Sequence, residues 1–375
     1  MIPFIDLKGQ YAKIEENVDK AIKKVLMHGQ YILGPEVAEL EKQLASFAGT
    51  KYCLACSSGT DALLMAMMAM DFKAGDAVFT TPFTFFATVE TIALTGATPV
   101  FADVEPDTYN MDPAKLREAI LKVKAEGKLT PKAIVAVDIF GQCADYDAIS
   151  AIADEFGLPI IEDAAQSMGA IYKGKRAPSF GKIGCTSFFP AKPLGCYGDG
   201  GAVFTDDKEL YDIMYSILVH GRGGDKYDNI LIGLNARLDT IQAAILLPKL
   251  KAMIDHEIDD RQKVADTYNA AFEKDFTTPY VIPQCQSIYA QYAILAKDTA
   301  TRDKVLAHLT EKKIPNMIYY PTPQHALPVF AEEPAYGETF ENANDYCART
   351  LSLPMHPYMT AEDQKTVIDA VLEAL

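Results

Sequence analysis

Three short segments of this chain carry residue types whose chemistry is complementary. The first, Cys56-Ser-Ser-Gly-Thr-Asp-Ala-Leu-Leu, places small hydroxyl residues directly before a predicted helix. The free backbone N–H groups and the dipole at a helix start favour an anion. Ser58 or Thr60 could equally act as an ordinary helix cap. On its own, this segment leaves anion binding and simple capping equally open.

The second segment is Leu158-Pro-Ile-Ile-Glu-Asp-Ala-Ala-Gln-Ser, whose apolar run ends in two carboxylates. A strand here would place Asp163 at the edge of a sheet where ligands bind. A carboxylate at that edge can keep a ring nitrogen protonated, as an electron-withdrawing ring cofactor requires. The alternative is a carboxylate that caps the next helix, and this segment alone slightly favours it.

The third segment is Cys185-Thr-Ser-Phe-Phe-Pro-Ala-Lys-Pro-Leu-Gly. We expect Ser187-Phe188-Phe189 to form a buried strand, with Lys192 in a turn between two prolines. Desolvation in so apolar a setting would lower the pKa of the amine and make it nucleophilic toward an aldehyde. An exposed loop lysine is the alternative. The glycines in Gly195-Cys-Tyr-Gly-Asp-Gly-Gly are expected to support the backbone behind Lys192 rather than to bind phosphate.

Alternating strands and helices are expected to position these segments. Apolar strands are predicted at 77–81, 99–102, 133–138, 159–162 and 202–204, with helices at 61–70, 86–94 and 146–156 among them. This alternation predicts a mostly parallel sheet with helices on both faces and ligands at the carboxyl ends of the strands. Two helices, 11–27 and 36–48, precede it, and a long helix over 239–261, with Pro248 inside, follows it.

The length of the chain predicts more than one domain. At 375 residues it exceeds what a single hydrophobic core usually holds. We expect residues 1–250 to form a large α/β domain with an N-terminal helical segment. Residues 251–375, where short strands mix with helices, should form a smaller C-terminal α+β domain.

Composition excludes several classes of partner. The formal net charge of −16 argues against nucleic acid, and no apolar run is long enough to insert into a membrane. Seven scattered cysteines and the lack of a basic-then-apolar leader favour a reduced, cytoplasmic setting. Neither Cys53-Leu-Ala-Cys56 nor the six dispersed histidines have the spacing of a metal site, so no metal is expected. The motifs of serine hydrolases, zinc proteases, P-loops and dinucleotide-binding folds are missing from the sequence.

Together and in this order, the three segments resemble the sugar aminotransferases of the DegT/DnrJ/EryC1/StrS family. The resemblance runs from Phe4-Ile-Asp-Leu, through Gly29-Gln-Tyr-Ile-Leu-Gly-Pro-Glu-Val, to Leu353-Pro-Met-His-Pro, which is nearly the whole chain. It implies the fold-type-I architecture and the cofactor pyridoxal 5′-phosphate (PLP).

The resemblance also implies a role for individual residues. Lys192 would be the Schiff-base lysine, and Asp163 would hold the pyridine nitrogen. Asn235, otherwise an ordinary turn residue, would reach the phosphate of the neighbouring subunit, which implies a homodimer with active sites at its interface. The other implied cofactor-binding residues are Gly59 and Thr60 with Ser187 at the phosphate, Phe85 stacked on the ring, and Gln166 near the ring hydroxyl.

A closer resemblance narrows the substrate. The stretches that begin at Phe140, Lys192 and Gln242 are similar to a subgroup that aminates UDP-2-acetamido-2-deoxy-3-oxo-glucuronate with L-glutamate, for bacterial surface polysaccharide such as lipopolysaccharide O-antigen. Arg237 could then grip the sugar carboxylate or, equally, only anchor a dimer interface. Tyr320 and His325 match the family pattern as substrate contacts, whereas Gln324 stands where leucine is usual, which puts the choice of sugar in question.

Other functions fit the residues less well. Another nucleotide-linked keto-sugar is the nearest alternative. A related PLP-dependent sugar dehydratase would carry histidine in place of Lys192. A non-catalytic regulator with a PLP fold would not need the full set of Asp163, Gln166, Ser187 and Lys192, and a nucleotide-binding dehydrogenase would need a glycine fingerprint that the chain lacks.

Overall fold

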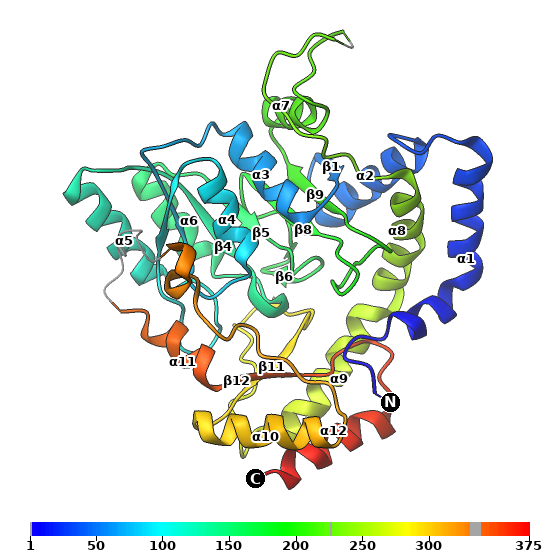
Figure 1. Cartoon of the computed structure of the whole chain (residues 1–375), viewed down its shortest axis with the longest axis vertical. Coiled ribbons are helices and arrows are strands. Elements are labelled where there is room, and N and C mark those ends of the chain that lie inside the picture. The colour runs from blue at the N-terminus through cyan, green and yellow to red at the C-terminus, as the bar shows by residue number, and fades with distance from the viewer. Residues whose placement is uncertain (1, 226, 331–338) are drawn as a thin grey trace.

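A seven-stranded sheet forms the centre of the molecule in a computed structural model that describes residues 2–225, 227–330 and 339–375 (Figure 1). The strand order is β1-β9-β8-β5-β4-β2-β3. All neighbouring pairs are parallel except those of β9, which runs antiparallel to both β1 and β8. The strands are β1 (Tyr52–Cys56), β2 (Asp76–Thr80), β3 (Thr98–Phe101), β4 (Thr130–Val137), β5 (Ile160–Asp163), β8 (Ile183–Ser187) and β9 (Gly201–Thr205).

Helices cover both faces of this sheet, as the apolar strands predict (Figure 1). Successive side chains of β4 point to opposite faces, so Ala133 and Val135 join one core while Ile134 and Ala136 join the other. The first core is packed by α3 (Gly59–Ala69), α4 (Phe86–Leu94) and α7 (Lys208–Leu218). The second face is covered by α5 (Pro113–Glu126) and α6 (Tyr146–Phe156), and beside them by α2 (Pro35–Ala48) and α8 (Thr240–Ala252).

The residues at the helix ends explain where the helices begin and stop. The side chains of Asp112 and Asp145 accept hydrogen bonds from the first backbone N–H groups of α5 and α6. Gly127 and Gly157 end the same two helices in the left-handed conformation, which glycine adopts without a steric cost. Helices 86–94 and 146–156 have the bounds that the sequence predicts.

The long helix near residue 250 differs from the prediction of a single helix over 239–261. Pro248 lies inside α8, and the hydrogen-bond pattern changes at the π-helical segment η2 (Met253–Glu257), after which α9 (Ile258–Phe272) continues. The predicted end at Arg261 is wrong, because Ala265, Tyr268 and Phe272 extend the buried face of α9 into the C-terminal core.

The C-terminal part has its own core around the two-stranded antiparallel sheet β11 (Tyr292–Leu295) and β12 (Thr350–Leu353). It also contains α10 (Thr299–Glu311), α11 (Glu341–Arg349) and α12 (Ala361–Glu373). Ile2 packs into this core, so the first residues of the chain contact its last part. The division into domains at residue 250 stays a prediction.

The remaining elements frame the two cores. Helix α1 (Leu7–His28) packs against α8 through Ile14 and Val18. A small sheet joins β10 (Cys285–Gln286), β6 (Ile171–Tyr172) and β7 (Lys175–Arg176).

All seven cysteines are free thiols. Over the described ranges, none of the helices has the length and apolarity to cross a membrane, and no group of three or more histidine, cysteine or acidic side chains is placed to hold a metal ion.

Candidate active site

The predicted site residues follow strands whose carboxyl ends share one edge of the sheet. Cys56 ends β1, Asp163 ends β5 and Ser187 ends β8, and these three strands point in the same direction. Each strand leads into a loop or helix that carries a predicted residue. The topology therefore brings segments that are more than 100 residues apart to one place, as the rule for open α/β sheets predicts.

The start of α3 forms a tight junction with the end of β8. Ser58 caps α3, since its hydroxyl accepts a hydrogen bond of 3.0 Å from the backbone N–H of Asp61. A Cβ atom on Gly59 would lie only 2.6 Å from Cβ of Ser187, so glycine is required for this close approach. The backbone N–H groups at the start of a helix have no partner within the helix. Gly59 thus lies beside Ser187, and Thr60 follows it in the first turn of α3; a junction of this kind is suited to a phosphate.

Replacing Gly59 with alanine should weaken the binding of a phosphorylated cofactor. The added methyl group must push the start of α3 away from β8, which separates the Ser187 hydroxyl from the helix N–H groups. An overpacked contact of this kind should lower the affinity for PLP by roughly 10- to 100-fold. A fluorescence titration of the cofactor-free protein with PLP measures it, and an unchanged dissociation constant would show that the phosphate is held elsewhere.

Asp163 is a buried carboxylate with two hydrogen bonds. Thr88 donates its hydroxyl to Oδ2 at 2.8 Å, and the backbone N–H of Ala165 donates to Oδ1 at 3.2 Å. Burial raises the pKa of Asp163, whereas these two hydrogen bonds and the charge of Lys192 act in the opposite direction. Each oxygen accepts one bond, so each keeps a lone pair for a further donor. The carboxylate is therefore able to receive a protonated ring nitrogen.

Lys192 lies in a loop that leaves the sheet earlier than the sequence predicts. Strand β8 ends at Ser187 and Phe189 is 53% exposed, so the predicted strand over 187–189 is wrong in its last two residues. The backbone turns back at once, and the N–H of Lys192 bonds the carbonyl of Phe189 at 2.8 Å. A Cβ on Gly195 would lie 2.4 Å from the Pro190 carbonyl oxygen, which confirms the supporting role predicted for this glycine.

The amine of Lys192 has the electrostatic surroundings that the sequence predicts. Burial lowers the pKa of Lys192, and the nearby charge of Asp163 partly offsets that effect. A lowered pKa leaves more of the amine in its neutral, nucleophilic form at neutral pH.

Gln166 joins the sheet edge to the C-terminal part of the chain. Its Oε1 accepts a hydrogen bond of 2.9 Å from the backbone N–H of Phe140, and its Nε2 donates to the Tyr320 hydroxyl at 3.0 Å. The ring of Tyr320 also lies 6.5 Å, centroid to centroid, from that of Phe85, whose side chain is 55% exposed. The structure thus brings Gln166, Tyr320 and Phe85 together, a grouping that their sequence positions do not indicate.

Residues 234–238 lie beside the end of β1 and the start of α3 in their own chain. The backbone N–H of Ser57 bonds the carbonyl of Ala236 at 2.8 Å, and Cys56 forms a β-bridge with Arg237. Asn235 is exposed and accepts a hydrogen bond from the Arg237 guanidinium. The buried Nε of Arg237 has no hydrogen-bond partner among the described residues.

His325 and Gln324 occupy different surroundings although they are adjacent. The His325 ring packs 4.2 Å from the Phe340 ring, and burial lowers its pKa. Gln324 instead donates from its backbone N–H to the Pro82 carbonyl at 2.8 Å and from Nε2 to the Thr84 carbonyl at 2.7 Å. Gln324 is thus buried against the loop before α4. The glutamine that stands where leucine is usual therefore contacts the residues that precede this helix.

Two threonine hydroxyls form a pair that the sequence does not predict. Thr84 lies in the loop just before α4 and Thr88 lies in the first turn of the helix; their hydroxyl oxygens are 2.8 Å apart, and Thr88 donates directly to Asp163. Because Thr84 precedes the helix, helical spacing does not predict this pair. The sequence also does not indicate that the two hydroxyls meet the end of β5.

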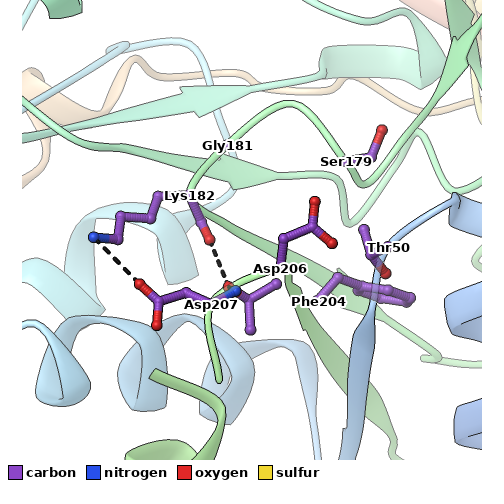
Figure 2. Close-up of a pocket in the computed structure, with 8 residues that line it drawn as sticks. Thr50, Ser179, Gly181, Lys182, Phe204, Asp206 and Asp207 are labelled. Carbon is purple, nitrogen blue, oxygen red and sulfur yellow. Dashed lines mark hydrogen bonds and ion pairs between the residues drawn. The ribbon is translucent and has the colours of Figure 1, made fainter. Parts of the chain in front are cut away.

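An open pocket of about 450 Å³ lies at the opposite edge of the sheet. Figure 2 shows Lys182 facing Asp207, and the two side chains form an ion pair of 3.5 Å. The Lys182 carbonyl also accepts a hydrogen bond of 2.9 Å from the Thr205 hydroxyl. Lys182 directly precedes β8, whereas Lys192 follows it, so this pocket is separate from the predicted site residues.

Comparisons with known proteins agree with this arrangement. Residues 12–372 match the DegT/DnrJ/EryC1/StrS aminotransferase family. The chain is 48% identical over 374 residues to a Pseudomonas aeruginosa protein named UDP-2-acetamido-2-deoxy-3-oxo-D-glucuronate aminotransferase, with 99% of each chain covered.

Solved structures are similar over the same length. A DegT DnrJ EryC1 StrS aminotransferase from Brucella abortus has 47% identity and a TM-score of 0.97, covering 100% of this chain and 99% of that one. DesV from S. venezuelae, solved with a ketimine intermediate, has 33% identity and a TM-score of 0.91, covering 99% and 98%. The chain therefore belongs to the DegT/DnrJ/EryC1/StrS aminotransferase family and is a PLP-dependent aminotransferase with the fold-type-I architecture.

Proposed function

We propose that this enzyme transfers the amino group of L-glutamate to the 3-keto group of UDP-2-acetamido-2-deoxy-3-oxo-D-glucuronate, for bacterial surface polysaccharide. The observation that carries the substrate is the 48% identity, over 99% of both chains, to the Pseudomonas aeruginosa protein of that name. The reaction class rests on Asp163 and Lys192 at one edge of the sheet beside a helix start that can hold a phosphate.

Each of these residues has a defined role in the proposed reaction. PLP, when bound, withdraws electrons from the carbon that exchanges its proton. The amine of Lys192 would hold the cofactor covalently until an amino substrate takes its place, and the freed amine would then move the proton as general base and acid. Asp163 would accept a hydrogen bond from the protonated ring nitrogen, and the free N–H groups at the start of α3 would orient the phosphate. Glutamate leaves as 2-oxoglutarate before the keto-sugar enters, so one site serves both substrates in turn.

A labelling experiment tests the substrate. The enzyme is incubated with PLP, glutamate carrying ¹⁵N in its amino group, and the UDP-3-oxo-glucuronate derivative, and the sugar nucleotide is analysed by mass spectrometry. We expect one ¹⁵N atom in the sugar. Formation of 2-oxoglutarate without label in this sugar would reject the substrate and direct the search to other nucleotide-linked keto-sugars.

Arg237 is proposed to bind the carboxylate of the sugar, and a comparison of two substrates tests this. Its guanidinium can grip a carboxylate through two parallel hydrogen bonds. We expect Arg237→Met to raise KM for the uronate by roughly 10- to 100-fold while leaving KM for the matching sugar without the carboxylate nearly unchanged. If both KM values rise alike and the oligomer weakens, Arg237 acts instead as an anchor at the interface.

We further propose a homodimer in which Asn235 reaches the phosphate of the neighbouring subunit. The exposure of Asn235 and the exposed apolar side chains close to it support this arrangement. Residues 221–225 and 227–232 extend beyond α7, away from the sheet (Figure 1), and include the exposed Ile230 and Ile232. Tyr31, Ile32 and Leu33 are also exposed, and Ile32 bridges Asp239. Sedimentation equilibrium tests the dimer.

Tyr320 and His325 are proposed to contact the sugar. The hydrogen bond between Gln166 and the Tyr320 hydroxyl supports a place for Tyr320 beside the cofactor-binding residues.

The cytoplasm is proposed as the compartment. The free thiols of all seven cysteines support a reducing environment.

A further inference from the structure

Asp163 lies at the end of a short chain of hydroxyl groups. The Thr88 hydroxyl donates to Oδ2 of Asp163 at 2.8 Å, and the Thr84 hydroxyl lies 2.8 Å behind it. The side chains of all three residues are buried. The interaction joins α4 to β5, two elements that the sequence separates by more than 60 residues.

The direction of this hydroxyl chain follows from the number of protons available. A threonine hydroxyl has one proton, and an ionised carboxylate can only accept. Because Thr88 gives its proton to Asp163, it can only accept from Thr84, and Thr84 must be the donor of that pair. Both hydroxyl dipoles then point at the carboxylate, and such chains strengthen one another. The hydroxyl chain therefore stabilises the ionised form of Asp163 and opposes the effect of burial, which raises the pKa of this carboxyl.

The far end of the hydroxyl chain is held by Gln324. Its Nε2 donates to the carbonyl of Thr84 at 2.7 Å, and its backbone N–H donates to the carbonyl of Pro82 at 2.8 Å. These two bonds fix the loop that carries Thr84 immediately before α4. Leucine, which is usual at position 324 in the subgroup that the sequence resembles, could not make the first of them.

We propose that Thr88, with Thr84 behind it, is a positioning residue of the aminotransferase: it holds the Asp163 carboxylate ionised and oriented toward the ring nitrogen of the cofactor. This inference rests on the proposed role of Asp163 as the partner of that nitrogen. Thr88 acts through Asp163 and needs no contact with the cofactor.

Other titratable groups near Asp163 do not replace this function. Among the described residues, Lys192 is the cation whose charge acts on Asp163, and it is already assigned in the proposed function to bonding the cofactor. The remaining neighbours are neutral or acidic groups on the adjoining strands and loops: Asp138, Glu162, Cys185 and Tyr320. Buried acidic neighbours disfavour a second negative charge, which makes the hydrogen bond from Thr88 more important for Asp163.

Thr91 provides a matched control on the same helix. It is also a buried threonine of α4, but its hydroxyl donates to the backbone carbonyl of Ala87, within the helix. Thr91→Val and Thr88→Val therefore remove the same hydroxyl group from equally buried positions, and only the second disturbs Asp163. Thr88→Ser keeps the hydroxyl and is the variant that should restore the function.

The experiment loads each holoenzyme with PLP labelled with ¹⁵N in the ring and follows the nitrogen signal by NMR as the pH is raised. For Thr88→Val we expect the midpoint for loss of the ring proton to fall by roughly one to two pH units. We also expect PLP to bind about 10- to 100-fold more weakly. Thr88→Ser and Thr91→Val should resemble the wild type in both measurements. Thr84→Val, should Thr88→Val not fold, is expected to shift the midpoint in the same direction by less.

The outcomes separate this inference from the proposed function. A wild-type ring nitrogen without a proton at neutral pH would contradict the role of Asp163 itself. A protonated wild type together with an unchanged Thr88→Val, or a Thr91→Val variant that shifts as far, would overturn the positioning role of Thr88 and leave that of Asp163 intact. Weaker PLP binding without a change in the nitrogen midpoint would also overturn it, because packing alone explains that result.

Discussion

Lys192→Ala is expected to lower turnover by at least about 10³-fold, because it removes both the nucleophile and the group that moves the proton. Among the described residues, Lys192 is the lysine whose charge acts on Asp163. The rate of 2-oxoglutarate release from glutamate, in the presence of PLP and the keto-sugar, measures the loss. Lys192→Arg should be equally inactive, because a guanidinium keeps the charge but is a poor nucleophile.

Lys182→Ala is the control for this prediction. Lys182 is half-exposed, pairs with Asp207 and lies in the pocket at the opposite edge of the sheet (Figure 2). An exposed ion pair of this kind contributes little to stability, so this variant should keep nearly the wild-type rate.

A small primary amine added to Lys192→Ala should restore part of the activity. Substantial turnover by Lys192→Ala alone would remove Lys192 from the reaction.

Asp163→Asn should lower kcat on the order of 10²- to 10³-fold, since it removes the charge that keeps the ring nitrogen protonated. The amide oxygen can still accept the hydrogen bond from Thr88, so the side chain should keep its place. Steady-state kinetics with saturating PLP separate this effect from weaker cofactor binding. A kcat near the wild-type value would show that the ring nitrogen does not depend on Asp163.

The same substitution, Asp163→Asn, should lower activity but should not lower the stability of the cofactor-free protein at neutral pH. Burial raises the pKa of Asp163 in the folded protein without cofactor, so ionising it costs folding free energy. This cost is absent well below the ordinary carboxyl pKa of about 4. It develops as the pH rises toward the raised value and is fully present above it. The cofactor-free Asp163→Asn variant should therefore melt at or above the wild-type temperature at neutral pH. The difference should shrink as the pH falls, and calorimetry at several pH values checks this.

Much of the fold follows from the sequence because local patterns and tertiary packing agree there. The β-branched run that includes Ile134 and Val135 predicts a strand buried on both faces, and the structure places it next to the centre of the sheet. Disagreement arises where backbone geometry overrides side-chain type. Phe188 and Phe189 favour a strand, but the close approach of Gly195 to Pro190 turns the chain away after Ser187.

The candidate site was predictable in its parts and less so in its connections. Asp163 and Lys192 follow apolar strands, and the order of those strands in a parallel sheet brings their ends together. The bonds from Thr88 to Asp163 and from Gln166 to Tyr320 join segments that are 75 and 154 residues apart. Single-sequence patterns report on neighbours within a helix or strand, so such long-range contacts lie beyond them.

The absorbance spectrum of the purified enzyme, followed through two additions, tests both the cofactor bound to Lys192 and the identity of the sugar. We expect a yellow band from PLP bound to Lys192, its loss on addition of L-glutamate, and its return when UDP-2-acetamido-2-deoxy-3-oxo-glucuronate is added. Loss without return would keep the aminotransferase and reject this sugar. A protein that shows no such band even after PLP is supplied would contradict the account.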